Sequence, residues 1–372
     1  MDATEDLDFT LCLNEGNIDP DVPRRLLLTL KQVDATFIVS PKSPKTLVNK
    51  DGYMRPTGRL HLGHLFGALD NWIRLQEEYE CYFFVADWHA LTTEYEETKG
   101  IRENIREMVL DMLAAGIDTS KATLFLQSRL HEHAELHLLL SMITPVPWLE
   151  RNPTYKEQQQ ELTTKDLSTY GFLGYPVLMA SDILIYKANY VPVGIDQVPH
   201  LELAREIARR FNHLYGEVFV EPKALLTDFA KVPGTDGRKM SKSYGNAIYL
   251  ADSPEQVTAK VKPMVTDPAR VRRSDPGNPD VCPVFDLHKI FTPKEERDAI
   301  IDPGCRTAGI GCLDCKGVLL NHMLSALRPI HERRRDLATR PGIVQEELED
   351  GCFRAKKVAG ETLAEAKEAM QI

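Results

Sequence analysis

The sequence lacks any uninterrupted apolar run that approaches the ~20 residues required by a membrane-spanning helix. Its longest apolar stretches, residues 136–143 and 171–180, are interrupted by polar residues or by proline. The first residues also lack a basic start followed by an apolar core, which is the pattern of a secretion signal. These absences exclude helical membrane spans, and we expect a cytoplasmic protein with no membrane partner.

Basic residues are missing from residues 1–20, which carry six carboxylates. The formal net charge of the chain is −10, and it becomes −4 for the other 352 residues once those six are set aside. Residues 1–45 show no hydrophobic period, so we predict an acidic N-terminal extension there. A mildly acidic chain can still bind nucleic acid, because such binding needs only a local basic face.

Internal repeats are absent, and 372 residues with 43% apolar and 27% charged content predict a globular protein of about two domains. Apolar runs predict strands at 82–86, 123–126, 191–194 and 218–220. Helical periodicity predicts helices at 61–76, 101–115, 176–186 and 199–211. This alternation predicts an α/β fold with a Rossmann-like, doubly wound parallel sheet.

Three regions follow from this pattern. We predict a catalytic domain over residues 46–255, with a helical insertion at about residues 130–175. Beyond about residue 255 the sequence favours a mostly α-helical domain over residues 256–372, with residues 326–337 and 351–370 as its clearest helices.

The first segment that suggests chemistry runs from Arg55 to His64, with the sequence RPTGRLHLGH. At a strand-to-helix turn, His61 and His64 lie on one face of the helix start. The helix N-terminus favours phosphate, and Gly63 lets a ligand approach the backbone closely. The alternative is an ordinary helix start with surface histidines.

The second segment is Lys239-Met240-Ser241-Lys242-Ser243, which lies among glycines about 175 residues downstream of the first. Two lysines on a mobile loop can follow the charge that develops on phosphate oxygens and on a departing pyrophosphate. A short Lys/Ser loop alone is usually only solvated. Its position downstream of a His-x-x-His element in an α/β chain favours phosphate chemistry instead.

Together the two segments resemble the paired signatures of class I aminoacyl-tRNA synthetases. The segments between them resemble the tryptophanyl-tRNA synthetase family at residues 88–90 (WHA), 149–151 (LER), 175–184 (YPVLMASDIL) and 191–197 (VPVGIDQ). The resemblance covers about residues 53–372, in order and without large gaps, and departs from the family at Ile195, where Glu is usual. It implies ATP-dependent ligation of L-tryptophan to tRNA(Trp) through a tryptophanyl-adenylate, with Mg²⁺-bound ATP as a substrate, a tRNA anticodon-binding function for the C-terminal domain, and a homodimer.

The segment from Tyr175 to Tyr186 supports an aromatic substrate on its own residues. If Pro176 occupies the first helical position, Tyr175, Met179, Asp182 and Tyr186 share one helix face. A lone carboxylate among apolar residues is costly unless it is paired, and it suits a flat apolar ligand that offers one N–H, as indole does. The alternative is an aspartate that caps or bridges elements within the core.

The resemblance implies roles for individual residues. The groups that steady phosphate oxygens or neutralise developing charge are His61, His64, Lys239 and Lys242. The tryptophan pocket is formed by His89, Tyr175, Met179, Asp182 (which accepts from the indole N–H) and Gln197. The remaining contacts to ATP are assigned to Arg55, Thr57, Gly63, Gly194, Asp196, Gln197, Met240, Ser241 and Ser243.

Four of the seven cysteines lie within 34 residues, with the spacing C-x22-C-x6-C-x2-C: Cys282, Cys305, Cys312 and Cys315. Four thiolates can hold zinc or a 4Fe–4S cluster. Zinc ribbons usually have two C-x2-C pairs, and only one is present here. The small and apolar flanking residues suit a bulky cluster, and the spacing resembles the iron–sulfur branch of the family. We predict a structural 4Fe–4S cluster that shapes a surface for the anticodon, with zinc and unligated thiols as alternatives.

Arginines gather around and after the cysteines, and we predict that they contact tRNA, since arginine binds phosphates and stacks on unpaired bases. They are Arg270, Arg272, Arg273, Arg328, Arg333, Arg334 and Arg335. The alternative is a set of solvated charges.

Three other functions remain open at this point. A tyrosyl-tRNA synthetase shares the predicted architecture, and another nucleotidyl transferase could share the two signatures. A non-catalytic paralogue could sense tryptophan, ATP or redox state, although the intact His61, His64, Lys239 and Lys242 favour an enzyme.

Overall fold

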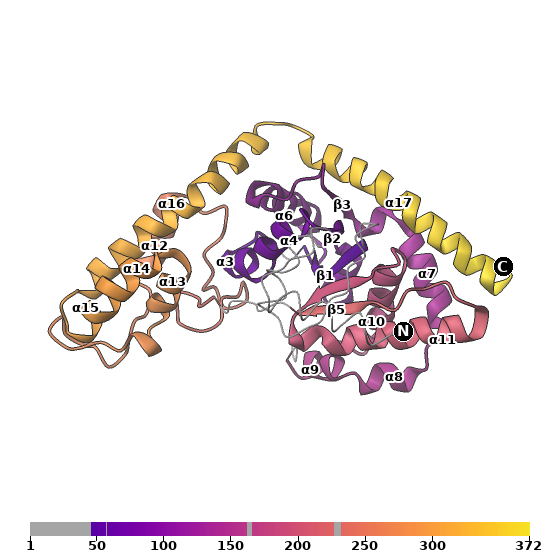
Figure 1. Cartoon of the computed structure of the whole chain (residues 1–372), viewed down its shortest axis with the longest axis horizontal. Coiled ribbons are helices and arrows are strands. Elements are labelled where there is room, and N and C mark those ends of the chain that lie inside the picture. Colours follow the sequence, from indigo (N-terminus) through magenta and orange to yellow (C-terminus); the bar gives the residue numbers. More distant parts are fainter. Residues whose placement is uncertain (1–45, 57, 162–165, 227–231) are drawn as a thin grey trace, which may run out of the picture.

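The computed structural model describes residues 46–372 except residues 57, 162–165 and 227–231 (Figure 1). The predicted acidic extension, residues 1–45, and the predicted ATP contact Thr57 therefore lie outside the described residues. A five-stranded sheet, all of whose strand pairs are parallel, has the order β3-β2-β1-β4-β5. The strands are β1 Thr46–Met54, β2 Glu80–Val85, β3 Ala122–Leu126, β4 Tyr190–Val193 and β5 Lys223–Leu226. The predicted doubly wound parallel sheet is confirmed.

Strand β2 shows why its apolar run is unbroken. Its side chains alternate between two cores: Cys81, Phe83 and Val85 belong to one, and Tyr82 and Phe84 to the other. Helices therefore cover both faces, and a strand that is buried on both faces needs no polar alternation.

The fourth crossover ends later than predicted, because the strand expected at residues 218–220 lies at Lys223–Leu226 instead. The backbone N–H groups of Val218 and Phe219 donate to the Asn212 side chain at 3.1 and 3.0 Å. A polar side chain thus satisfies donors that the prediction had assigned to a sheet, and the chain turns before it pairs with β4.

The helix that follows β1 runs from Leu62 to Leu75 as α3 (Leu62–His64), a π-helical turn (Leu65–Leu69) and α4 (Asp70–Leu75). The other helices around the sheet are α5 Asp87–Glu94, α6 Ile101–Ala115, a 3-10 turn Gln127–Arg129, α7 His131–Ser141, α8 Val146–Arg151, α9 Pro153–Glu161, α10 Tyr170–Leu184, a 3-10 turn Ile195–Gln197 and α11 Val198–Tyr215. Helix α10 begins six residues before Pro176, which lies inside it, so the prediction of proline at the first position was wrong. Thr169 caps this earlier start by accepting from the N–H of Phe172.

The C-terminal region is mostly helical, as predicted. Its elements are α12 Pro254–Val261, a 3-10 turn Pro279–Val281, α13 Pro283–Phe291, α14 Lys294–Glu296, a π-helical turn Arg297–Ile301, α15 Asp302–Arg306, α16 Cys312–Ala338 and α17 Ile343–Met370. Figure 1 shows α12–α16 as an arm beside the sheet, from which α17 turns back. None of the helices in the described part of the chain has the length and apolar character needed to cross a membrane.

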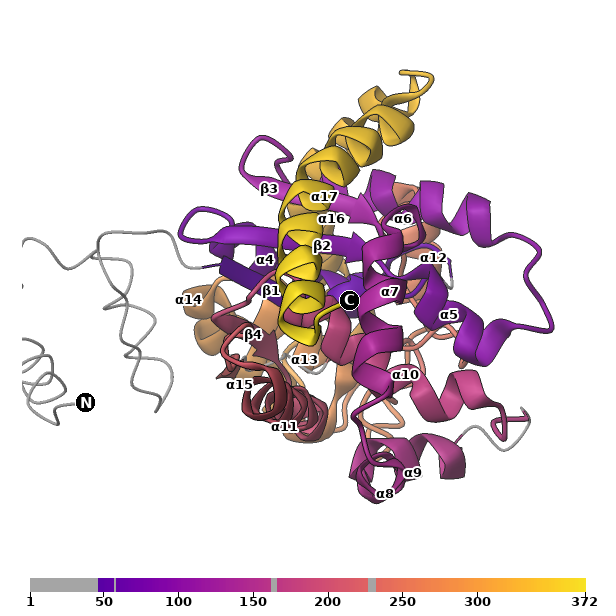
Figure 2. The ribbon, with the colours of Figure 1, turned by 90° about the vertical axis from the view of Figure 1, so that its right-hand side faces the viewer.

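Helix α17 packs over the sheet, as Figure 2 shows, rather than with α12–α16. Its small side chains Ala355, Ala359 and Ala366 lie in the same core as Tyr82 and Phe84 of β2. The last part of the predicted domain 256–372 therefore completes the core of the sheet layer, and the domain division itself stays a prediction.

Candidate active site

The loop after β1 ends in two imidazoles that lie against each other, tilted by 37°, at the start of α3. The ring centroids of His61 and His64 are 3.7 Å apart, so the two rings share one face as expected. The backbone N–H of His61 donates to Nδ1 of His64 at 3.1 Å. Nε2 of a neutral His64 ring therefore carries its N–H. Burial, with the nearby Lys242 ammonium, lowers the pKa of His61 to about 4, and burial also lowers that of His64. Both imidazoles are therefore neutral at pH 7.

Gly63 leaves room for the His61 ring in this arrangement. A Cβ at this position would lie 2.8 Å from Cε1 of His61, so any larger residue displaces the ring. The glycine thus serves the placement of His61.

The lysine-bearing loop is held by Asn246, a residue that the sequence analysis missed. Asn246 is buried; its Oδ1 accepts from the Ser241 N–H at 2.8 Å, and its Nδ2 donates to Asp236 at 2.7 Å and to the Lys239 carbonyl at 3.2 Å. A Cβ on Gly234 would lie 2.2 Å from this amide. The sequence signal that could have identified it is an Asn directly after Gly245 in a Gly-rich loop.

The predicted contacts within this loop face different ways. Met240 is buried in the core below the loop, so its side chain is not part of the loop surface as an ATP contact would require. Ser241 and Ser243 share a hydrogen bond between their hydroxyls at 2.8 Å, and Lys239 is exposed.

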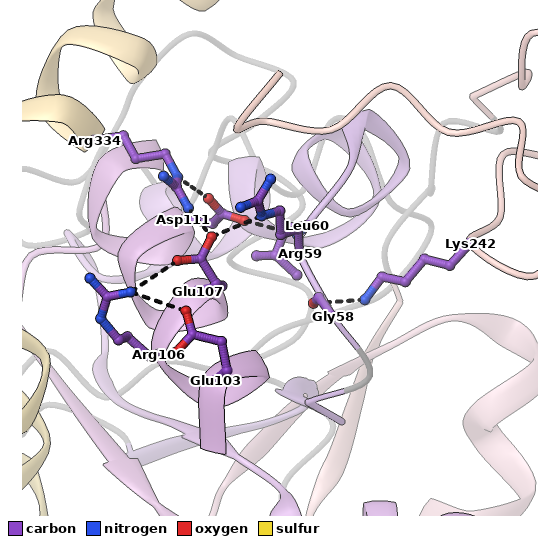
Figure 3. A network of polar contacts seen from close by, with 9 residues as sticks. All are labelled: Gly58, Arg59, Leu60, Glu103, Arg106, Glu107, Asp111, Lys242 and Arg334. Atoms are coloured by element: carbon purple, nitrogen blue, oxygen red, sulfur yellow. Dashed lines mark hydrogen bonds and ion pairs between the residues drawn. The ribbon is translucent and has the colours of Figure 1, made fainter. Parts of the chain in front are cut away.

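Backbone hydrogen bonds place the two signature segments side by side. Leu62 donates to the carbonyl of Ile248 at 3.0 Å, and Leu250 donates to that of Leu60 at 2.9 Å. From the lysine loop, Nζ of Lys242 donates to the Gly58 carbonyl at 2.9 Å (Figure 3). Burial, with a smaller effect of the Arg55 guanidinium, lowers the pKa of Lys242 to about 8. An ammonium group thus lies beside the turn that leads to the two histidines.

A charged network fixes the backbone of the same turn from the opposite side. Asp111 on α6 accepts from the Leu60 N–H at 2.9 Å and from Arg334 of α16 at 2.6 Å. Glu107 joins Arg334 and Arg59 at 2.7 and 2.8 Å (Figure 3). Helix α16 of the C-terminal region is thereby linked, through Asp111, to Leu60, the residue before His61.

This network changes the prediction for the basic residues. Arg334 is committed to Asp111 and Glu107, and Arg333 donates to the carbonyls of Ala114 and Ala115. Arg270 is buried and donates to the carbonyls of residues 273 and 310. These three arginines make contacts that hold the fold together, although Arg333 is itself exposed. The other four are exposed: Arg272, Arg273, Arg328 and Arg335.

Asp182 is buried, but it is not the lone carboxylate that we predicted. Its Oδ2 accepts from Nε2 of His89 at 2.8 Å, and its Oδ1 accepts from Nδ1 of His133 at 2.7 Å. The amide nitrogen of Gln127 reaches both oxygens at 2.9 and 3.0 Å. Burial alone would raise the pKa of Asp182, but the bonds from His133 and His89 outweigh it and hold the pKa below its ordinary value. The carboxylate is therefore ionised and oriented by donors from three other elements.

The other predicted pocket residues lie on or near the same helix. Tyr175 and Met179 of α10 are buried, and the Tyr175 hydroxyl is 3.1 Å from Nε2 of His200 on α11. Helix α5 connects these predicted pocket residues to the segment Arg55–His64. It carries His89, which is bound to Asp182, and Thr93, which accepts from Arg55 at 3.2 Å.

Gly194 and Gln197 lie at the carboxyl end of β4, next to β1 in the sheet, where nucleotides bind in doubly wound folds. The Gln197 N–H donates to the Gly194 carbonyl at 2.9 Å. The side chain of Asp196 lies outside the described residues. Ile195, the departure from the family pattern, is 76% exposed, so its side chain supports no packing.

The four clustered cysteines come from different elements: Cys282 precedes α13, Cys305 lies in α15, and Cys312 and Cys315 begin α16. Burial, together with the three other thiols nearby, raises the pKa of Cys315 to about 12. Within the described residues no three His, Cys, Asp or Glu side chains are arranged to hold a metal ion. Four neighbouring thiols are suitable ligands for a metal centre. Their positions in the structure do not form a metal site.

Comparison with known proteins places this geometry in a family. A family model described as tRNA synthetases class I (W and Y) matches residues 50–327. A tryptophan–tRNA ligase of Thermotoga maritima is 56% identical and one of Aquifex aeolicus 47%; each match covers 86% of this chain and 98% of the relative. Among solved structures, the chain resembles a tryptophanyl-tRNA synthetase of Campylobacter jejuni complexed with ADP and tryptophan, with a TM-score of 0.79 and 32% identity over 88% of this chain and all of that one.

Proposed function

The chain belongs to the class I tRNA synthetases for tryptophan and tyrosine, and we propose that it ligates L-tryptophan to tRNA(Trp) with ATP. The choice of tryptophan rests on relatives of that activity whose sequences this chain matches almost from end to end. The observation that carries the chemistry is the contact of Lys242 with the turn that precedes His61. It brings an ammonium group close to the turn that leads to two neutral imidazoles, which supports phosphate binding there.

In the first step the tryptophan carboxylate attacks the α-phosphate of ATP, and pyrophosphate leaves. Lys239 and Lys242 neutralise the charge that grows on the phosphate oxygens, and neutral His61 and His64 donate N–H groups to them. Each contribution is electrostatic and positional, and no covalent bond to the enzyme forms. In the second step the terminal ribose hydroxyl of tRNA attacks the acyl-adenylate, while Mg²⁺ accompanies ATP as part of the substrate.

The same proposal assigns the remaining site residues. Asp182 accepts from the indole N–H in a pocket lined by His89, Tyr175, Met179 and Gln197. Contacts to ATP are made by Arg55, Thr57, Gly63, Gly194, Asp196, Gln197, Ser241 and Ser243, and by the backbone of Met240. A homodimer, a cytoplasmic location and tRNA binding by the C-terminal helical region rest on the resemblance to the family.

Amino-acid-dependent exchange of pyrophosphate into ATP tests this function. We expect exchange with tryptophan and at most a trace with tyrosine, because an acceptor placed for the indole N–H does not meet the hydroxyl at the far end of a phenol ring. Charging of tRNA(Trp) by the same preparation distinguishes an enzyme from a non-catalytic paralogue. Exchange with tyrosine alone would assign the chain to the tyrosyl branch of the family.

We also propose that Cys282, Cys305, Cys312 and Cys315 hold a 4Fe–4S cluster, with zinc as the less favoured occupant. The support is the donor set itself: four thiols gathered from three helical segments, of which Cys282 is buried. Such a cluster would tie α13, α15 and α16 together and so shape the end of the arm seen in Figure 1.

Anaerobic purification followed by metal analysis tests the cluster. We expect about four iron atoms and four sulfides per chain, a brown colour, and loss of both in Cys312→Ser. Pyrophosphate exchange by Cys312→Ser should be close to that of the wild type, while tRNA charging falls. A colourless protein with one zinc per chain would contradict the iron assignment, and the control Cys352→Ser, remote in sequence from the four, should retain the metal.

A further inference from the structure

One of the donors to Asp182, His133, continues into a buried chain of hydrogen bonds. His133 of α7 contacts Asp182 through Nδ1 at 2.7 Å and the Tyr186 hydroxyl through Nε2 at 2.8 Å. All three side chains are at most 1% exposed. Neither His133 nor Tyr186 has a role in the two reaction steps described above. Burying polar side chains is costly, and hydrogen bonds offset that cost.

The protons in this chain can be assigned. An ionised carboxylate only accepts, so Nδ1–H of His133 donates to Asp182, and in this tautomer Nε2 accepts from the Tyr186 hydroxyl. The Tyr186 hydroxyl retains its proton, because burial, with the nearby Asp182 charge, raises its pKa. The direction of donation therefore runs from Tyr186 through His133 to Asp182.

Aromatic packing holds His133 and Tyr186 in place. Tyr186 stacks on Tyr82 at 4.4 Å between ring centroids, and the His133 ring packs beside both Phe84 and Phe125 at 6.0 and 5.8 Å. The Ser181 hydroxyl, next to Asp182 in α10, also lies 3.2 Å from the His133 carbonyl. His133 is thus held by β2 and β3 through its ring and by α10 through its backbone carbonyl.

We propose that His133, held by Tyr186, is a positioning residue that sets the direction of the Asp182 lone pairs and thereby the preference for a substrate ring bearing an N–H. This inference rests on the proposed function, in which Asp182 accepts from indole. Without His133, Oδ1 of Asp182 keeps only the Gln127 amide, which reaches both oxygens, so the carboxylate is less firmly oriented. Preorganised acceptors discriminate best. His133 therefore acts on selectivity without touching the substrate.

The test compares tryptophan with its benzothiophene isostere, 3-(benzothiophen-3-yl)alanine, in which sulfur replaces the N–H. The measured quantity is the ratio of kcat/KM for the two amino acids in pyrophosphate exchange by the full chain. In His133→Leu, which has no donor, we expect the ratio to fall about tenfold or more through weaker use of tryptophan, with the KM for ATP unchanged. His133→Asn, of similar size, keeps a donor at the Nδ1 position, so the ratio should stay within about threefold of that of the wild type.

The remaining variants separate the possible failures. Tyr186→Phe removes one oxygen, and we expect a ratio lowered about threefold, a result available even if His133→Leu does not fold. An equal loss for both amino acids in His133→Leu, or an unchanged ratio in Tyr186→Phe, would overturn the positioning role. If the wild type and Asp182→Asn both fail to prefer tryptophan over the isostere, the indole contact itself is wrong. If Asp182→Asn loses a preference that His133→Leu retains, the indole contact stands and only the positioning role of His133 is wrong.

Discussion

Replacement of Lys242 with alanine is expected to lower kcat/KM for ATP in tryptophan-dependent pyrophosphate exchange by about 10²–10³-fold, the usual effect of losing one preorganised group that stabilises transition-state charge. The reason is geometric, because Nζ lies 2.9 Å from the Gly58 carbonyl at the turn that leads to His61. Binding of tryptophan, measured without ATP, should stay within a few-fold of that of the wild type. The exposed Lys99 supplies the matched control, and Lys99→Ala should exchange normally.

The conservative variant Lys242→Arg adds a pH test of the same group. The pKa of Lys242 is lowered to about 8 by burial, so the free enzyme loses this charge as the pH rises through 8. Since kcat/KM reports the free enzyme, kcat/KM for ATP should decline above about pH 8 in the wild type. Arginine remains protonated throughout this range, so Lys242→Arg should lack this decline. A wild-type profile that stays flat to pH 9.5 would contradict the role of a protonated Lys242.

Gly351→Ala is expected to destabilise the protein severely, although alanine normally stabilises a helix. Gly351 lies where α17 crosses β3, and a Cβ there would be 1.7 Å from the Leu124 carbonyl oxygen. This oxygen belongs to the backbone of the edge strand β3, whose pairing with β2 limits its movement, so helix and strand must separate. We expect a loss of about 3 kcal/mol or more in the free energy of unfolding, the upper part of the range for overpacked cores.

The measurement is the thermal unfolding midpoint, which should fall by roughly 5–10 °C for that loss. The control lies on the same helix: a Cβ on Gly360 meets no atom within 4 Å, so Gly360→Ala should raise stability by about 0.5–1 kcal/mol. Equal midpoints for the two variants would show that α17 does not pack against β3 in solution.

Local sequence patterns were sufficient for much of this protein. The alternation of apolar runs and helical periods predicted the parallel sheet, and the two signature segments with their intervening motifs predicted the family, which the comparisons confirm. Helix 101–115 was predicted with its observed bounds, because a glycine stands at each end and its apolar face is regular. These features depend on short-range preferences of the backbone and on the burial of one face.

Long-range pairing decided the rest. The partners of Asp182 come from positions 49, 55 and 93 residues away, and those of Asp111 from positions 51 and 223 residues away. No local period records such distances, so the sequence predicted a lone carboxylate in the first case and, in the second, an Arg334 available for tRNA. Likewise the sequence marked residues 351–370 as a helix, but only the tertiary structure placed α17 against β3.

The sequence by itself therefore determined which chemical groups this protein has and which elements carry them. The tertiary structure decided which of those groups are charged, oriented and available. The reason is physical: the pKa of a side chain and the direction of its hydrogen bonds depend on burial and on neighbours brought together by folding, and the amino-acid order contains these only through the complete fold.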